Sequence, residues 1–334
     1  MTASTTPVGV LVMAHGTPST VAGIEPFYTA IRRGNPPPPE LLDQLVGRYA
    51  AIGGTSPLTE RTRAQVDGVA EALEAAAPGR FIVRFGAKYV RPTIEEGMAE
   101  LIAAGVSRVI GIVLTPHQST LGSGGYFLRA ETAASSATRA VDFTSIPSWH
   151  RTEGFAGLLA VRTRSALRAI DAGSGGRTAV FFTAHSLPLR AVAEGDPYPG
   201  QVAESAADIA ALLGLDDIPG LTWGVAWQSA GRTTDAWIGP DLLSEIERVA
   251  SEGVASVAVC PVGFVSDHLE ILYDLDIEAS QLADSLGVAF ARTASLNDDP
   301  RFLELLAGVV QETAGSPSAP GRPDPAPAGA PFSP

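Results

Sequence analysis

One histidine and a spaced row of carboxylates are the side chains here whose types could do chemistry together. His185 ends an apolar run, and much later in the chain Glu270, Asp274 and Glu278 follow one another at intervals of four residues. On an α-helix that interval predicts one acidic stripe, because residues four apart share a face. A solvated helix face is the alternative for carboxylates alone. An imidazole facing them, however, can accept protons and bind a divalent metal ion.

The segments around these residues resemble those of the ferrochelatases, the enzymes that insert ferrous iron into a porphyrin. The resemblance covers most of the chain, from Val8 to Thr313. The matching segments are FFTAHSLP at 181–188, PVGFVSDHLEILYDLDIE at 261–278, LVMAHGTP at 11–18, IRRG at 31–34, RYAAIGGTSPL at 48–58, GDPYP at 195–199, WQSAG at 227–231 and DAWIGPD at 235–241. So many matches in a single order indicate the whole family pattern rather than one shared motif.

The resemblance implies roles for the histidine and the carboxylates. Metal insertion requires that two pyrrole protons leave, that hydrated Fe²⁺ loses water, and that the flat macrocycle is held and bent. By resemblance, His185 abstracts protons and contacts the metal, while Glu270 assists as second ligand or proton relay. Asp274 and Glu278 would extend this pair into an acidic path or an outer divalent-cation site. Fe²⁺ is then a substrate, and no tightly bound cofactor is expected.

His15 is the position at which the chain departs most from the family. Many ferrochelatases have tyrosine or another residue here, on the opposite face of the porphyrin from the catalytic pair. A histidine at this position could ligate the iron of bound haem, bind incoming metal or serve only the structure, and the sequence leaves these alternatives open. His117 is expected to shape the cleft wall and His268 to hold its loop by a hydrogen bond. Trp237 is expected to line the cleft, with a buried indole as the alternative.

Three arginines and two hydroxyl side chains are candidates for binding an anionic substrate. Arg32, Arg33 and Arg48 lie in one stretch of the chain, and guanidinium groups pair in a bidentate manner with carboxylates such as those of porphyrins. Surface charge is the alternative role for these arginines. By resemblance, Ser56 and Tyr126 lie near the porphyrin, and Tyr126 follows a glycine-rich stretch whose backbone has freedom to move.

Composition limits the classes of protein to which the chain can belong. Its 334 residues can form one large domain or two ordinary ones, and a net charge of −13 argues against nonspecific binding to nucleic acid. The single cysteine, Cys260, excludes a disulfide within the chain and an iron–sulfur cluster ligated by its thiolates alone. We expect Cys260 to be a buried strand residue. With no secretory signal and no apolar run of ~20 residues, we expect no transmembrane segment and a cytoplasmic location.

The chain alternates short apolar runs with stretches of helical periodicity. Continuous apolarity is typical of parallel strands that are covered on both faces. The expected strands are 8–14, 81–87, 109–114, 179–183, 221–227 and 257–260, with helices such as 62–76 and 94–104 between them. This alternation predicts an α/β fold with doubly wound, Rossmann-like parallel sheets.

Two parts of the chain repeat each other. AHGTP at 14–18 is echoed by AHSLP at 184–188, which predicts similar halves at 8–150 and 151–313 with a cleft between them. Open α/β sheets bind ligands beyond the carboxyl ends of their strands, where both histidines of the repeat are expected.

Two further segments stand outside the repeat. The first half is longer, which predicts an insertion near 27–58 that grips the porphyrin. The segment 314–334 is rich in proline and alanine, and we expect a disordered tail there.

The leading hypothesis is a ferrochelatase that inserts Fe²⁺ into coproporphyrin III during haem synthesis. The absence of a hydrophobic membrane-binding extension favours this four-carboxylate porphyrin over protoporphyrin IX, which carries two carboxylates. The alternatives are a protoporphyrin IX ferrochelatase, a cobalt or iron chelatase of the sirohydrochlorin type, and a non-catalytic haem carrier. If the first hypothesis holds, an enzyme that decarboxylates iron-coproporphyrin is the expected downstream partner.

Overall fold

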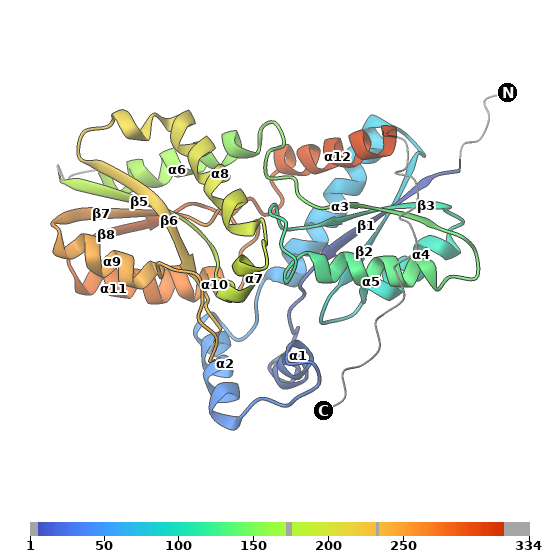
Figure 1. Cartoon of the computed structure of the whole chain (residues 1–334), viewed down its shortest axis with the longest axis horizontal. Helices are drawn as coiled ribbons and strands as arrows, with labels where there is room; N and C mark the ends of the chain where they lie inside the picture. Colours follow the sequence, from blue (N-terminus) through green and yellow to red (C-terminus); the bar gives the residue numbers. More distant parts are fainter. Residues whose placement is uncertain (1–5, 172–175, 232–233, 317–334) are drawn as a thin grey trace.

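Two four-stranded parallel sheets form the frame of the molecule (Figure 1). The computed structural model describes residues 6–171, 176–231 and 234–316. The first sheet has the order β2-β1-β3-β4 and consists of β1 Val8–Ala14, β2 Phe81–Ala87, β3 Arg108–Val113 and β4 Asp142–Ile146. The second has the order β6-β5-β7-β8 and consists of β5 Arg177–His185, β6 Leu221–Gln228, β7 Val254–Cys260 and β8 Ala289–Arg292. The two orders are equivalent, so the predicted doubly wound α/β fold is confirmed.

The edge strands β4 and β8 are the strands that the apolar pattern did not predict. β4 has one buried residue among its five, and none of the four residues of β8 is buried. A half-exposed edge strand needs no continuous apolar run, so its sequence gives a weak signal.

Helices cover both faces of each sheet. In Figure 1, α12 lies above the first sheet and α4 and α5 lie below it, while α6 and α8 lie above the second sheet and α9 and α11 below it. Their bounds are α3 Leu58–Ala76, α4 Ile94–Ala103, α5 Gly124–Ser135, α6 Phe155–Asp171, α8 Tyr198–Leu213, α9 Leu242–Ser251, α11 Ser280–Ser285 and α12 Pro300–Gly315. The cover on both faces explains why the central strands are almost entirely buried.

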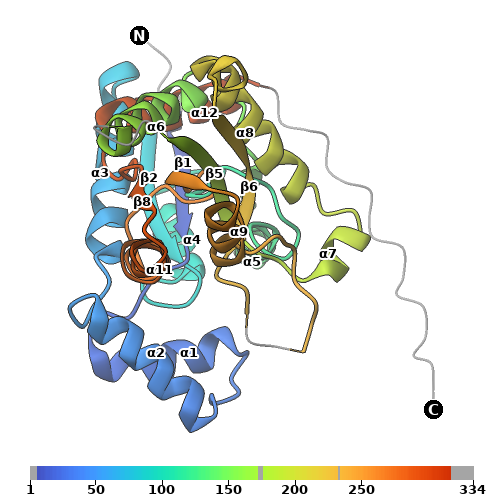
Figure 2. The ribbon, with the colours of Figure 1, turned by 90° about the vertical axis from the view of Figure 1, so that its left-hand side faces the viewer.

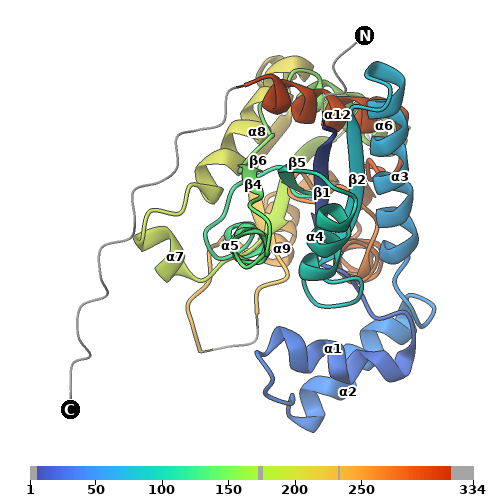
Figure 3. The same ribbon diagram turned by 90° about the vertical axis from the view of Figure 1, so that its right-hand side faces the viewer.

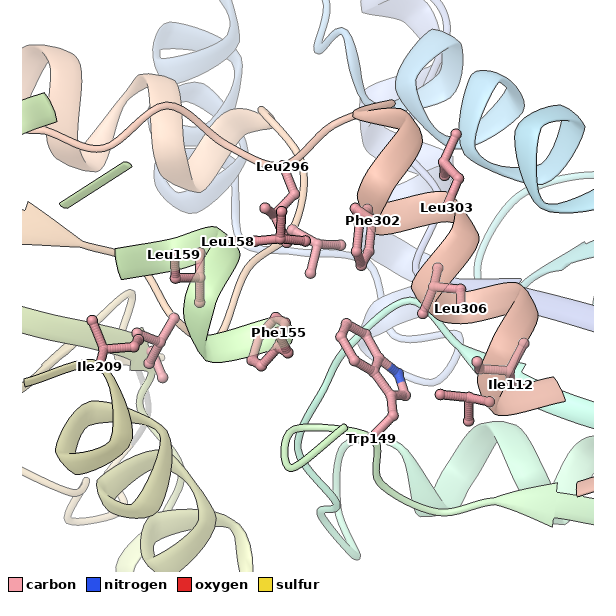
Figure 4. Packing of buried hydrophobic residues seen from close by; sticks show 14 of the residues in the cluster. Ile112, Trp149, Phe155, Leu158, Leu159, Ile209, Leu296, Phe302, Leu303 and Leu306 are labelled. Atoms are coloured by element: carbon pink, nitrogen blue, oxygen red, sulfur yellow. The ribbon is translucent and has the colours of Figure 1, made fainter. Parts of the chain in front are cut away.

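One hydrophobic core joins the halves (Figure 4). Trp149 lies between them, with its ring centroid 5.1 Å from that of Phe155 on α6 and 5.7 Å from that of Phe302 on α12. Its indole N–H donates to the carbonyl oxygen of Val113 at the end of β3, 3.0 Å away. Although α12 ends the described chain, it packs on α3 and β3 of the first half, which a division at residue 150 did not predict. The shared core fixes the halves relative to each other.

The inserted segment after β1 forms two helices, α1 Ile24–Ile31 and α2 Pro39–Ala51. Figures 2 and 3 show both helices standing apart from the sheets, at the end of the molecule nearest α10 and α11. Ile24 and Tyr49 of this segment form a small core with Leu269 of the second half. The insertion therefore contacts the half that carries the acidic segment.

Short elements complete the described chain. They are α7 Leu189–Ala193, α10 Leu269–Leu272, a π-helical turn at Asp274–Ala279, and 3₁₀ turns at Val21–Gly23 and Leu215–Asp217. Helix α12 runs to Gly315, two residues into the predicted tail, and residues 317–334 lie outside the described part. No helix in the described part is both long and apolar enough to cross a membrane.

Candidate active site

Two histidines occupy equivalent places in the two halves. His15 directly follows the central strand β1, and His185 ends the central strand β5. In each ring Nδ1 lies near the next residue's carbonyl oxygen, at 3.0 Å from Gly16 and at 2.5 Å from Ser186. A carbonyl only accepts, so Nδ1 is the donor in both. In the neutral form of either ring, Nε2 is then left with its lone pair.

His185 faces a carboxylate that is held by two strands. Its Nε2 lies 3.8 Å from Oε1 of Glu270, and both side chains are about one third exposed. The backbone of Glu270 is fixed because Gln228 donates to its carbonyl oxygen at 3.0 Å, and Thr183 in turn donates to the Gln228 amide at 2.8 Å. At 3.8 Å the two groups attract without a direct hydrogen bond, so each keeps a lone pair for a third partner.

Glu270 is ionised at neutral pH. Burial alone would raise its pKa, but the facing histidines His185, His268 and His15 lower the pKa to about 2. His268 contributes from 3.6 Å, and its Nδ1 donates to the Ser266 carbonyl oxygen at 2.9 Å. The predicted loop-holding hydrogen bond of His268 is thereby confirmed. Across the described residues, no three His, Cys, Asp or Glu side chains stand close enough together to enclose a metal ion.

The acidic stripe takes a different backbone form from the predicted one. The spacing of Glu270, Asp274 and Glu278 suggested one face of an α-helix, but α10 ends at Leu272 and a π-helical turn begins at Asp274. A π turn is wider than an α turn, so residues four positions apart no longer lie directly above one another on one face. The three carboxylates nevertheless line one cavity of about 460 Å³, together with His15 and His185. We call it the acidic cavity.

Asp274 is a buried carboxyl group in mixed surroundings. It is 5% exposed, forms an ion pair with Arg48 and accepts a hydrogen bond from Ser229. Burial raises its pKa to about 6; Arg48 opposes the shift, and the negative charge of Glu270 adds to it. Glu278 is exposed. The stripe thus runs from an ionised carboxylate beside His185 outward to the surface.

A second cavity of about 360 Å³ meets the acidic cavity at the histidines. We call it the aromatic cavity; its lining includes Tyr89, Tyr126, Tyr198, Ser119 and Lys88. Both cavities are lined by His15, Leu58, His185, His268 and Glu270. The reactive pair therefore stands where the two cavities join.

The predicted substrate-binding residues are distributed unevenly. Ser56 is buried and lines the acidic cavity with Arg48, and Tyr126 lines the aromatic cavity, where burial raises its pKa. Arg32 and Arg33 follow α1 and are not among the lining residues of either cavity.

Trp237 and His117 are two further side chains that were expected at the cleft. The Trp237 ring is 6.4 Å from that of His185, although Trp237 lines neither cavity. His117 lines the aromatic cavity, as expected, and bonds to the Ser205 hydroxyl at 2.9 Å. Burial lowers the pKa of His117 to about 3, so it stays neutral.

His15 has aromatic rather than acidic neighbours. Its ring centroid lies 4.8 Å from that of Tyr89 and 5.7 Å from that of Phe27. Loss of bulk water in the cleft lowers the pKa of His15, even though the ring keeps exposed surface. The ring is therefore a neutral imidazole that presents Nε2 across the cleft.

Lys88 is a charged group in the cleft that the sequence reasoning missed. It follows the last residue of β2, at the carboxyl edge of the first sheet, and lines the aromatic cavity. The strand 81–87 was predicted, so its position just beyond a strand end was the available signal.

Comparisons with known proteins agree with this geometry. The family model described as Ferrochelatase matches residues 7–314. The chain is 41% identical over 301 residues to a ferrochelatase of Herpetosiphon aurantiacus, covering 90% of this chain and 97% of that protein. It is 38% identical over 305 residues to a coproporphyrin III ferrochelatase of Geobacillus thermodenitrificans, covering 91% and 95%.

Solved structures support the fold. SirB from Bacillus subtilis with Fe³⁺ gives a TM-score of 0.54 at 13% identity, covering 92% of this chain and 96% of that one. CbiX, described as the terminal enzyme for biosynthesis of siroheme in denitrifying bacteria, gives 0.51 at 13% identity, covering 91% and 98%. At such low identity, these neighbours show a shared fold alone.

Proposed function

The chain belongs to the ferrochelatase family, and on this premise we propose that it inserts Fe²⁺ into coproporphyrin III, with His185 as proton acceptor and Glu270 as its partner. Family membership makes it a porphyrin metal chelatase of haem synthesis, whose substrates are a porphyrin and iron. The choice of porphyrin and the roles of individual residues are the proposed part.

The observation that carries the proposal is the pairing of His185 with an ionised Glu270 where the two cavities join. As Fe²⁺ displaces each pyrrole proton, the nitrogen's N–H electron pair becomes its bond to iron, and Nε2 of His185 takes the proton. The negative charge of Glu270 stabilises the imidazolium that forms. The imidazolium then passes the proton to Glu270 or to water before the second pyrrole reacts, so two protons leave for each iron inserted.

The acidic cavity suits the approach of a hydrated cation. Glu270, Asp274 and Glu278 line it from the reactive pair to the surface, and oxygen ligands suit divalent cations. We propose that Fe²⁺ enters along this side and that Asp274 and Glu278 hold an outer divalent cation. Arg48 balances part of the charge at Asp274. No other tightly bound group is proposed.

Coproporphyrin III is proposed as the porphyrin because of the cations in the inserted segment and the relatives' names. Arg32 Nε and Arg48 Nε are buried without a hydrogen-bond partner. The Arg48 guanidinium already pairs with Asp274, so its Nε is the group left for a substrate carboxylate, and the Arg32 guanidinium can pair with another. Several relatives at 37–38% identity are named coproporphyrin III ferrochelatases. A four-carboxylate porphyrin would use more of these cations than one with two carboxylates.

Anaerobic insertion of Fe²⁺ into coproporphyrin III and, separately, into protoporphyrin IX tests the proposal. We expect the absorption band of coproporphyrin to shift with time for the wild type, with little turnover of protoporphyrin. Glu270→Gln should still bind porphyrin, measured by fluorescence quenching, while insertion is lost. A preference for protoporphyrin would contradict the substrate, and full activity of Glu270→Gln would contradict the assigned pair.

The cellular setting is a further part of the proposal. We propose that the protein acts in the cytoplasm and passes iron-coproporphyrin to an enzyme that decarboxylates it. Cell fractionation and transfer of labelled product to such an enzyme would test these two points.

A further inference from the structure

Lys88 is the only lysine among the 23 basic residues of the chain. Every other basic side chain is arginine, so the composition favours arginine strongly. The one lysine stands just beyond β2 and lines the aromatic cavity. A single exception at the carboxyl edge of a parallel sheet is a position for ligand contact.

The surroundings of Lys88 leave its charge without a carboxylate. Its Nζ lies 4.6 Å from the ring centre of Tyr126 and 5.6 Å from that of Tyr89, and it donates weakly to the Gly122 carbonyl oxygen at 3.4 Å. In the part of the chain that the structure describes, no ion pair includes Lys88. Aromatic faces and one carbonyl compensate an ammonium only partly.

The nearby acidic side chain is already occupied. Arg129 binds both carboxylate oxygens of Glu95, at 2.7 and 2.6 Å, and also donates to the carbonyl oxygen of Lys88 at 2.5 Å. Burial and the positive charge of Arg129 both lower the pKa of Lys88. The charges of Lys88, Arg129 and Glu95 add up to +1, whereas the net charge of the whole chain is −13.

The space around Lys88 and the lack of a partner favour its contact with an anion. A Cβ built on Gly125 would lie 3.0 Å from Nζ, so the glycine at this position leaves the ammonium its space. Ser119 and Ser123 line the same cavity, but their hydroxyls already donate to Asp196 at 3.0 Å and to the Ser119 carbonyl oxygen at 3.2 Å. The site thus places one ammonium, without a carboxylate partner, on an aromatic wall, which suits a carboxylate attached to a flat apolar body.

We propose that Lys88 binds a carboxylate side chain of the porphyrin, with the macrocycle lying across the rings of the aromatic cavity. The proposal rests on the proposed function, because that function supplies the carboxylated macrocycle. It adds a binding position on the first half, opposite the arginines of the inserted segment. A substrate held on both sides would present its centre to His185 and Glu270.

The uniqueness of Lys88 provides a direct test. Reductive methylation with ¹³C-formaldehyde labels Lys88 and the N-terminal amine and keeps their charge. Coproporphyrin III should shift the Lys88 signal in the ¹³C–¹H NMR spectrum. Coproporphyrin III tetramethyl ester, which has no free carboxylate, should leave the pH titration of that signal unchanged. Lys88→Met identifies the signal. An unmoved Lys88 signal with bound coproporphyrin would overturn the proposal.

Affinity gives an independent readout. We expect Lys88→Met to weaken coproporphyrin III binding about tenfold, as for loss of one charge-assisted hydrogen bond, and to leave binding of the ester unchanged. Arg84→Met, which removes a cation of the same strand outside the cavity (paired with Glu100 at 3.0 Å), is the matched control. Equal losses for acid and ester would contradict a carboxylate contact. Iron insertion by the wild type tests the proposed function separately, so the two can fail independently.

Discussion

The two halves of the molecule each place a histidine at the equivalent strand end, but the side chains around the two histidines differ. His15 after β1 and His185 at the end of β5 both donate from Nδ1 to the next carbonyl oxygen and leave Nε2 for the cleft. His185 faces Glu270 at 3.8 Å, whereas His15 packs against the rings of Tyr89 and Phe27. Equivalent backbone positions therefore place one histidine beside an ionised carboxylate and the other among aromatic rings.

The segment after the third strand of each half accounts for this difference. After β7 the chain carries His268, Glu270 and the π-helical turn, whereas residues 114–123 after β3 include no carboxylate. The second half provides the missing acid, because Asp196 accepts from Ser119 and Thr120 of that loop at 3.0 and 2.8 Å. The repeated fold thus offers two sites, and one connecting segment decides which of them can take protons.

Removal of the two histidines in turn is the strongest way to break this comparison. We expect His185→Ala to lower kcat/KM for iron insertion by roughly 10²–10⁴-fold, the usual contribution of a positioned proton acceptor. His15→Ala should lower it less than about tenfold, because Glu270 lies 3.8 Å from His185, whereas no ion pair joins a carboxylate to His15 within the described residues. Anaerobic insertion kinetics on both variants are the measurement. Equal losses would mean that the halves share the proton transfer.

Asp196→Asn tests how one half supports the other. Asp196 is 8% exposed, forms no ion pair within the described residues, and also accepts from the Tyr198 N–H at 3.0 Å. The amide keeps that bond but turns a donor toward Thr120, so the loop that leads to Tyr126 should loosen. We expect KM for the porphyrin to rise about tenfold, as for hydrogen bonds to a charged group, with kcat changed less.

Asp208→Asn, on helix α8, which begins two residues after Asp196, is the matched control for Asp196→Asn. A lower melting temperature with an unchanged porphyrin KM would show that Asp196 serves stability alone.

The sequence predicted the parts of this arrangement that depend on local pattern. Apolar runs gave the central strands, and the family motifs gave His185 and Glu270. Contacts between distant segments left no such trace: Arg48 and Asp274 pair across 226 positions of sequence. The π-helical turn was missed because a four-residue spacing also fits an α-helix. Lys88 was missed because a single lysine forms no spaced motif with other residues.

The neighbours of helix α12, most of which falls in the predicted second half 151–313, were not indicated by the sequence pattern. Its apolar face shows that the helix is buried, but that face does not specify which sheet buries it. In the structure it packs on α3 and β3 of the first half.

The titration of Asp274 should give a smaller effect, on the KM for Fe²⁺, that tests the role of the second half in binding the metal ion. Its pKa of about 6 means that the carboxyl is largely ionised at pH 7 and largely protonated at pH 5. We expect KM for Fe²⁺ to rise a few-fold over this fall in pH, because the acidic cavity loses a negative charge. Asp274→Asn should lack this step, and a wild-type KM without a step near pH 6 would contradict the assignment.

The same shift has a consequence for folding. The folded pKa lies above the ordinary 3.8, so folding favours the protonated form. This contribution to stability is present below about pH 4 and is lost as the pH rises through 6. Asp274→Asn should therefore flatten the dependence of the unfolding free energy on pH between these values.

The smallest expected effect on catalysis concerns Cys260 at the end of β7. Its thiol is fully buried, and burial raises its pKa to about 11, so the thiolate that reacts and binds metal is scarce at neutral pH. We expect Cys260→Ala to keep its insertion rate within twofold and to lose about 1 kcal/mol of stability, in line with removal of a small buried group. Thiol reagents should likewise leave the folded enzyme active. Loss of insertion at unchanged melting temperature would instead place Cys260 in the chemistry of the second half, and the contrast between the halves would then rest on more than the segment after β7.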